Sequence, residues 1–247
     1  MTSSLFHTLS ISRQDILSRL SALDVTSNNL ANVNTAGFKT NRSNFQEMFQ
    51  QKIKEGTQLL NTQLITTQGS LRDSTNPLDW AIQGDGYFSV TLPDGTIGYT
   101  RDGQFGLDAN LQLVTAKGYP LVWSGAIAEG MTDITISPEG VISARDATGA
   151  NTQVGTVQLT RFANPTGIKS FGDNIWLESV DSGAAQVGDA GSENFGTING
   201  YRVEQSNMEL SQELTQMMTL QRSFSMSIKA FQQTDMMINQ AINIRKA

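Results

Sequence analysis

The chain has 247 residues, of which 38% are hydrophobic, and a formal net charge of -6. This length allows one large domain or two modest ones. The acidic balance and the lack of a basic block make nucleic acid a poor partner, because phosphate binding needs clustered Lys and Arg. The absence of cysteine excludes disulfides, a thiol nucleophile and zinc–thiolate sites.

The N-terminal sequence gives no targeting or membrane signal. It lacks a basic segment followed by an apolar run of about 7–15 residues, which a secretory signal peptide has. No stretch approaches the roughly 20 apolar residues needed to cross a bilayer. We therefore expect a protein that is not inserted in a membrane and has no cleaved signal peptide.

The first predicted element is an amphipathic helix from residue 2 to about residue 34, within a terminal segment 1–36. Its end is indicated by Asn-rich sequence and then by Gly37, which is free to take a positive φ. One face of this helix repeats at steps of three and four, with Phe6, Leu9, Arg13, Ile16, Leu20, Leu23, Ser27 and Leu30.

Residues 37–76 are predicted to form a linker or an extended arm. Within them, residues 44–54 have the pattern of a short helix that Gly56 would end. Its apolar face would carry four residues, Phe45, Met48, Phe49 and Ile53. Residues 59–71 are rich in Thr, Gln and Asn and suggest extended structure or a long hairpin arm.

Residues 77–180 are predicted to form an antiparallel β domain. Turn signals such as Pro93-Asp94-Gly95 and Glu139-Gly140 recur every 8 to 12 residues, with short alternating runs between them. This spacing is typical of an all-β domain. The Gly-, Ala- and Ser-rich residues 181–200 are predicted to be a linker.

Residues 201–247 contain neither Pro nor Gly after Tyr201 and predict a long helix, about 60 Å at about 1.5 Å per residue. Its seam again steps by four and three, from Leu210 to Arg245, over about five heptads. A domain of this size cannot bury so long a stripe alone, so the helix needs a partner. Other apolar residues lie off the seam and predict a second contact face: Met218, Leu220, Met226 and Met237.

These elements predict an α+β fold in which the N- and C-terminal helices form a coiled-coil-like module and an antiparallel all-β domain is inserted between them. The two helices are expected to pair with each other or with copies from other chains. This layout suits a subunit that polymerises through its ends. The predicted subunit-interface residues are Phe6, Leu9, Ile16, Leu20, Leu23, Leu30, Leu210, Leu214, Met217, Phe224, Ile228, Phe231, Ile238 and Ile242.

No catalytic, cofactor or metal site is predicted. The only histidine, His7, has no clustered partner for metal binding or for a catalytic triad. The Gly84-Asp85-Gly86 segment lacks the third glycine of a dinucleotide fingerprint and precedes a strand. Three turn aspartates, Asp94, Asp102 and Asp108, do not have the spacing of a calcium-binding loop.

Four segments of the sequence resemble signatures of the bacterial flagellar rod and hook family. They are SNNLANVNTAGFK at residues 27–39, PLDWAIQGDGYF at 77–88, YTRDGQF at 99–105, and QSNMEL at 205–210 followed by QRSF at 221–224. The matches fall in order across nearly the whole chain. The β domain and C-terminal half resemble a distal rod protein, whereas the 40 residues between Phe38 and Asp79 are closer to a proximal rod protein. A short hook protein shares the same motifs, but hook proteins usually carry a further outer domain that is absent here.

The resemblance implies a structural subunit, not an enzyme, that is exported unfolded through the flagellar type III apparatus into the cell-envelope rod of the basal body. Its partners would be copies of itself, other rod proteins and the hook protein. The terminal helices would line the inner tube and order on assembly, the β domain would form the outer layer, and residues 39–76 would lock neighbouring subunits. Two other classes stay open: a rod-associated peptidoglycan hydrolase, and an adaptor that binds only other proteins.

Overall fold

The computed structural model describes residues 2–47, 57–146 and 148–246. They fold as two compact units. We call the first the helical unit; it comprises Met1–Val33, Thr40–Ile65 and Met208–Ala247. We call the second the β unit; it comprises Asn34–Lys39 and Thr66–Asn207. The predicted α+β class, with an all-β domain between terminal helices, is confirmed.

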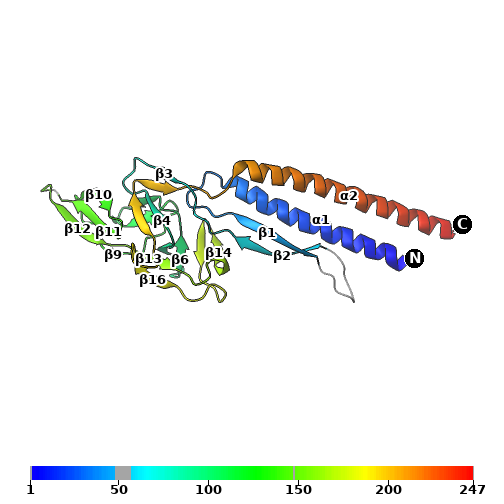
Figure 1. The fold of residues 1–247 in the computed structure, drawn as a ribbon, viewed down its shortest axis with the longest axis horizontal. Coiled ribbons are helices and arrows are strands. Elements are labelled where there is room, and N and C mark those ends of the chain that lie inside the picture. The colour runs from blue at the N-terminus through cyan, green and yellow to red at the C-terminus, as the bar shows by residue number, and fades with distance from the viewer. Residues whose placement is uncertain (1, 48–56, 147, 247) are drawn as a thin grey trace. The chain divides into compact units, whose positions relative to one another are not determined.

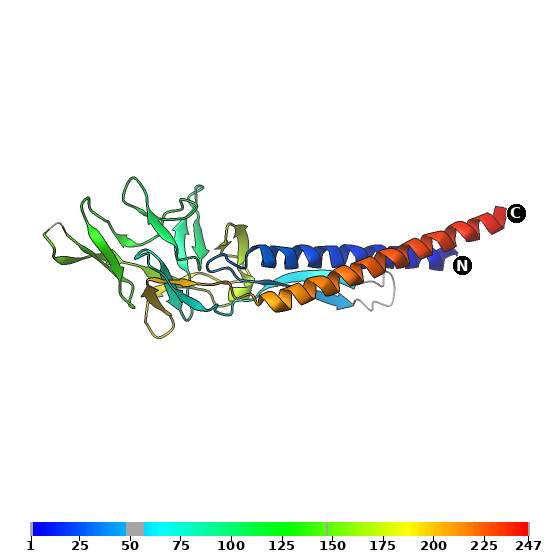
Figure 2. The ribbon, with the colours of Figure 1, turned by 90° about the horizontal axis from the view of Figure 1, so that it is seen from above.

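Two long helices and a hairpin make up the helical unit. Helix α1 (Thr2–Ala31) and helix α2 (Leu210–Lys246) lie side by side and run in opposite directions (Figures 1 and 2). Strands β1 (Asn41–Glu47) and β2 (Thr57–Leu64) form an antiparallel hairpin that packs on α1. The helices therefore pair with each other within one subunit, which is one of the two pairings expected.

The hairpin changes the interpretation of the segment after α1. The predicted short helix is wrong for residues 44–47, which are strand, and the rest of that prediction, residues 48–54, lies outside the described residues. The predicted hairpin arm is confirmed for residues 59–64. Residues 44–47 pair with β2 in a strand whose register shifts between Asn44 and Phe45, and pairing with a neighbouring strand overrides the local apolar spacing.

Sixteen strands make up the β unit within the described residues, and every pair between them is antiparallel. Two sheets have four strands, in the orders β10-β11-β12-β9 and β14-β15-β6-β5. The strands are β3 (Leu71–Asp73), β4 (Trp80–Gln83), β5 (Phe88–Thr91), β6 (Ile97–Thr100), β7 (Phe105–Leu107), β8 (Leu113–Thr115), β9 (Ser124–Gly125), β10 (Thr132–Ile136), β11 (Val141–Arg145), β12 (Asn151–Thr156), β13 (Gln158–Arg161), β14 (Lys169–Gly172), β15 (Ile175–Leu177), β16 (Gln186–Asp189), β17 (Thr197–Gly200) and β18 (Arg202–Glu204).

The last three strands correct two predicted boundaries. Residues 181–200, expected to be a linker, contain β16 and β17, which pair with β13 and β4. The C-terminal helix begins at Leu210 and not near residue 201, because β18 pairs with β3 first. Short Gly-rich strands of this kind carry little sequence signal, and their partners lie far away along the chain.

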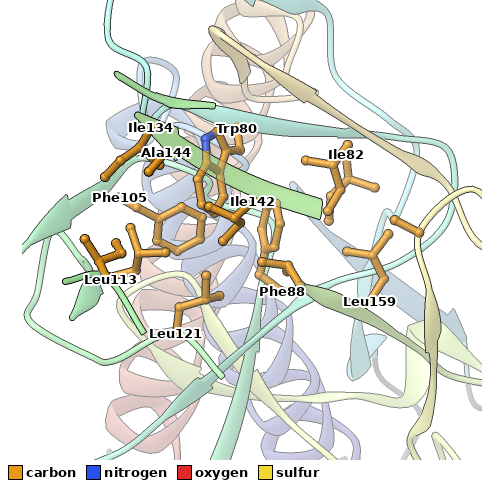
Figure 3. Close-up of a cluster of buried hydrophobic side chains, with 14 residues drawn as sticks. Trp80, Ile82, Phe88, Phe105, Leu113, Leu121, Ile134, Ile142, Ala144 and Leu159 are labelled. Carbon is orange, nitrogen blue, oxygen red and sulfur yellow. The ribbon is translucent and has the colours of Figure 1, made fainter. Parts of the chain in front are cut away.

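The core of the β unit is a cluster of large apolar side chains from strands that are distant in sequence (Figure 3). Trp80 is fully buried, its ring centroid lies 5.3 Å from that of Phe105, and its indole N–H donates to the carbonyl of Pro77. Phe88 meets Phe105 edge to face, with centroids 5.2 Å apart. Each such pair stabilises the fold by about 0.5–1.5 kcal/mol beyond the contribution from burying its rings.

Glycines are required between these strands for two different reasons. Gly95 has a φ of 81°, which the turn between β5 and β6 requires. Gly103 lies where two backbones approach closely, and a Cβ there would be 1.6 Å from the carbonyl oxygen of Trp80. The turn at Gly95 was predicted from the sequence, whereas the close approach at Gly103 is visible only in the structure.

Candidate subunit interface

The face of α1 that is buried within the helical unit is small and polar. Ser18, Ala22, Thr26 and Asn29 follow each other at steps of four, four and three, and each is at most 5% exposed. Small side chains let a neighbouring backbone approach closely. The buried face of α1 is therefore not the leucine-rich stripe that the sequence pattern singled out.

The corresponding face of α2 is apolar. Leu220 and Ile238 are buried. Four further residues at heptad-like spacing are partly buried, namely Met217, Phe224, Ile228 and Phe231. Among the buried residues, helix α2 thus supplies large side chains and α1 small ones.

Polar contacts also join the two helices. The Ser227 hydroxyl donates to Asp15 Oδ2 at 2.5 Å, and the same carboxylate pairs with Arg19 at 2.9 Å. Near the other end, Asn29 Nδ2 donates to Glu213 Oε1 at 3.2 Å. Burial raises the pKa of Glu213, and the hydrogen bond from Asn29 opposes that shift.

Asn29 also binds the hairpin. Its Nδ2 donates to the carbonyl of Asn41 at 2.9 Å, and its Oδ1 accepts the Asn41 N–H at 3.0 Å. One buried amide therefore joins α1, the start of β1 and α2. A groove of about 460 Å³ runs beside it, lined by Ala22, Val25, Thr26, Asn29, Asn41, Arg42, Ser43, Ile65, Gln212, Glu213, Gln216 and Leu220.

Both helices also carry exposed apolar side chains, which together we call the outer faces. On α1 they are Leu17 and Leu20, 43% and 44% exposed. On α2 they are Leu210, Leu214, Met218, Met226, Met236 and Met237, between 41% and 63% exposed. The first three of these lie four residues apart along the helix. A row of exposed apolar residues at helical spacing is typical of a surface that binds another protein.

The fourteen predicted interface residues divide between these surfaces. Leu20, Leu210 and Leu214 lie on the outer faces. The side chains of Phe6 and Ile242 lie outside the described residues, as does that of His7. The other nine are buried or partly buried: Leu9, Ile16, Leu23, Leu30, Met217, Phe224, Ile228, Phe231 and Ile238.

The off-seam residues of α2 behave in two ways. Met218, Met226 and Met237 are exposed, as the prediction of a second apolar face requires. Leu220 belongs to the buried face instead. The sequence reasoning missed Ser18, Thr26 and Asn29, because small and polar residues give no hydrophobic period.

The described residues contain no group of three or more His, Cys, Asp or Glu side chains placed to hold a metal ion. None of the described helices is both long and apolar enough to span a bilayer. The helical unit presents exposed apolar side chains on its outer faces and a buried amide between its elements.

Comparison with protein-family models gives three matches, in chain order. Residues 13–39 match "Flagella basal body rod protein", residues 81–144 match "Flagellar hook protein FlgE/F/G D1 domain", and residues 200–244 match "Flagellar basal body rod FlgEFG protein C-terminal". The first and third matches cover most of α1 and α2, and the second lies in the β unit.

The chain is also similar over most of its length to flagellar basal-body rod proteins FlgG from several bacteria. It is 34% identical to that of Borreliella burgdorferi over 246 aligned residues, covering 91% of this chain and 93% of the relative. The values are 34%, 90% and 93% for Caulobacter vibrioides, and 34%, 91% and 93% for Bacillus subtilis. The chain therefore belongs to the family of flagellar basal-body rod proteins FlgG, and it is a structural subunit of the rod.

Proposed function

We propose that the chain polymerises helically to form the distal rod, the drive shaft between the flagellar motor and the hook. The outer faces of α1 and α2 are the surfaces through which copies bind each other. A head-to-tail contact that does not close on itself generates such a filament. The family membership and the exposed rows on the helices support this function.

The observation that carries the proposal is the spacing of the exposed residues on α2. Leu210, Leu214 and Met218 are separated by one helical turn each and are all more than 40% exposed. The β unit also exposes large apolar residues, but each of them lies on a different strand or loop: Ile97, Leu107, Val122, Phe171, Val180, Val187 and Tyr201. Among the residues whose side chains the structure describes, helix α2 is the element that carries such a row.

The proposal includes the partners and location that go with a rod subunit. Copies of the chain, other rod proteins and the hook protein are its neighbours, and the flagellar type III apparatus exports it without a cleaved signal peptide. The hairpin β1–β2 belongs to the segment that locks neighbouring subunits. The role is structural and requires no catalysis.

Self-assembly of the purified full-length chain tests the proposal. Concentrated wild-type protein is expected to form filaments, visible by electron microscopy and sedimentation. The double variant Leu214→Gln/Met226→Gln is expected to remain soluble as single subunits. A matched control is Val180→Gln, which alters a fully exposed residue of the β unit and should still assemble. Equal assembly of all three proteins would refute the role of the outer faces.

The position along the rod is tested separately, in cells that lack the gene. Electron microscopy of their basal bodies should show a rod that stops after its proximal part and carries no hook. A complete rod and hook in these cells would contradict the proposal, and a rod missing from its base would favour a proximal position.

A further inference from the structure

The chain passes between its two compact units four times, after residues 33, 39, 65 and 207. Within the β unit, three short segments lie next to these passages: residues 37–39, 67–69 and 204–207. Contacts among these three segments therefore join the places at which the chain enters and leaves the β unit. All the contacts described below lie inside the β unit.

The carboxylate of Glu204 is the centre of these contacts. Its side chain is fully buried. Oε1 accepts hydrogen bonds from Lys39 Nζ at 2.5 Å and from the backbone N–H of Gly69 at 3.0 Å. Oε2 faces Arg101 Nη1 at 3.4 Å. One acidic side chain thus reaches all three segments and the strand end at Arg101.

Lys39 and Arg101 are held by further groups. Lys39 Nζ also donates to the carbonyl of Thr67 at 2.8 Å, and its side chain is 1% exposed. Arg101 donates to the carbonyl of Gly84 at 2.8 Å and lies 5.2 Å above the ring of Tyr87. Burial lowers the pKa of Lys39, and the charge of Glu204 opposes that shift.

Backbone contacts link the same segments directly. Gly37 N–H donates to the carbonyl of Glu204 at 2.7 Å, and Asn207 N–H donates to the carbonyl of Phe38 at 3.4 Å. The Asn207 amide donates to the carbonyl of Thr67 at 3.1 Å. Gly37 has a φ of 64°, and a Cβ there would lie 2.4 Å from the carbonyl carbon of Arg101, so the segment fits only with glycine.

Three buried charges are an expensive way to stabilise a fold. Removing ions from water costs several kcal/mol each, and well-packed apolar side chains often stabilise as well or better. The charges here connect separate segments. One carboxylate accepts hydrogen bonds from several directions at once, whereas an apolar side chain makes no directed bonds. The arrangement thus indicates that the charges connect these segments more than they stabilise the fold as a whole.

We propose that Lys39, Arg101 and Glu204 form a clasp that binds the three passage segments to one another. The three segments therefore open together, and a force applied to one of them is distributed over all three. In a shaft that transmits torque, such a clasp keeps the chain passages from separating under load. That mechanical use depends on the proposed function, whereas shared opening is a property of the single subunit. The two can therefore fail independently.

Hydrogen exchange of the full-length wild-type subunit gives the first test. Three backbone amides each bond into another segment of the clasp: Gly37, Gly69 and Asn207. In low concentrations of urea they are expected to exchange at similar rates with the same urea dependence, as one cooperative unit. Three distinct urea dependences would overturn the proposal, and this measurement needs no variant to fold.

Substitution gives the second test. Lys39→Met removes the ammonium group but keeps an apolar stem, and Glu204→Gln removes the central charge. Each is expected to raise exchange at least about tenfold in all three segments, since charged hydrogen bonds are lost. Amides in β5 should not change. A rise confined to the segment that carries the substitution, or no rise, would show that the contacts are only local.

A matched control lies on the same pair of strands. Arg202 pairs with Asp73 at 3.0 Å across β18 and β3, with side chains 45% and 85% exposed. Arg202→Gln is expected to change exchange in the three segments by no more than about twofold, because exposed ion pairs contribute little. An effect as large as that of Glu204→Gln would mean that any charge loss near β18 loosens the region, which would overturn the clasp.

Discussion

The β unit buries a cluster of large apolar side chains, whereas the helical unit buries few. Trp80, Ile82 and Phe88 are fully buried in the first. In the second, the described residues include only four buried apolar side chains, Ala22, Leu64, Leu220 and Ile238, alongside buried Ser18, Thr26 and Asn29. The two units therefore differ in what holds them together as well as in what they expose.

This difference separates a domain that is complete in itself from a surface that awaits a partner. Burial of a side chain such as Phe or Leu contributes about 1.5–3 kcal/mol, so the β unit has its stability within its own core. The helical unit has long helices, small buried residues and apolar outer faces. A polymer that is built through its helices and carries a preformed globule fits this division.

The largest expected effect lies in the β core. Trp80→Ala removes a fully buried ring that packs against Phe105 at an interplanar angle of 56°, and it should lower the free energy of unfolding of the β unit by about 3–5 kcal/mol. Urea denaturation followed by circular dichroism measures this loss. The helical unit keeps its own contacts, so exchange rates within α1 and α2 should change much less.

An exposed aromatic residue of the same unit is the control. Phe171 on β14 is 46% exposed, and Phe171→Ala should change the unfolding free energy by no more than about 0.5 kcal/mol. If Trp80→Ala changed the unfolding free energy equally little, the stability of the β unit would not depend on its own hydrophobic core. The contrast with the helical unit would then fail.

The second effect is a gain. Burial raises the pKa of Asp102 from its ordinary 3.8 to about 6, the Gln104 N–H opposes the shift, and the charge of Asp79 adds to it. The folded state therefore holds this proton more tightly than the unfolded state. The stability that depends on it is present below about pH 4 and is lost as pH rises to about 6. Asp102→Asn should remove this loss and raise the unfolding free energy at pH 7 by up to about 3 kcal/mol.

Urea midpoints of the wild type and Asp102→Asn between pH 4 and 7 test this, since their difference should be near zero at pH 4 and grow with pH. Asp108 is the contrasting case, because hydrogen bonds from Gln112 and Asn110 lower its pKa. Its contribution is present above its ordinary pKa and lost in acid, so Asp108→Asn should destabilise at pH 7. If Asp102→Asn gave no pH-dependent gain in the free energy of unfolding, the conclusion that burial raises the pKa of Asp102 would be contradicted.

The third effect concerns the helical unit and its polar core. Asn29→Ala leaves the N–H and carbonyl of Asn41 and the carboxylate of Glu213 without this partner, and should destabilise the unit by about 1–3 kcal/mol. Exchange of amides in β1 and α1 measures the change. Asn28→Ala, one residue away and exposed, should be nearly neutral.

Asn29 also shows where sequence reasoning stopped. Apolar period predicted both helices, and turn residues such as Asp94-Gly95 predicted the antiparallel β domain, because these signals are local. Asn29 gave no such signal, since its partners are 12 and 184 residues away. The same holds for Glu204, which reaches Lys39 across 165 residues. The seam of α2 was predicted with Gln221 in it, but Leu220 is the buried residue, because packing on α1 decides the register.

The smallest expected effect on the single subunit is on the outer face, where function should be affected most. Met226→Gln alters a side chain that is 63% exposed, so the unfolding free energy of the subunit should change by less than about 0.5 kcal/mol. Leu220→Gln, on the buried face of the same helix, should cost about 2 kcal/mol or more, because it places an amide where an apolar side chain was buried. Thermal unfolding at low protein concentration measures both. Since the outer face contributes little to the stability of its own subunit, its apolar residues are explained by what binds there. A large loss from Met226→Gln in the single subunit would show instead that this face belongs to a private core, and the contrast between the two units would disappear.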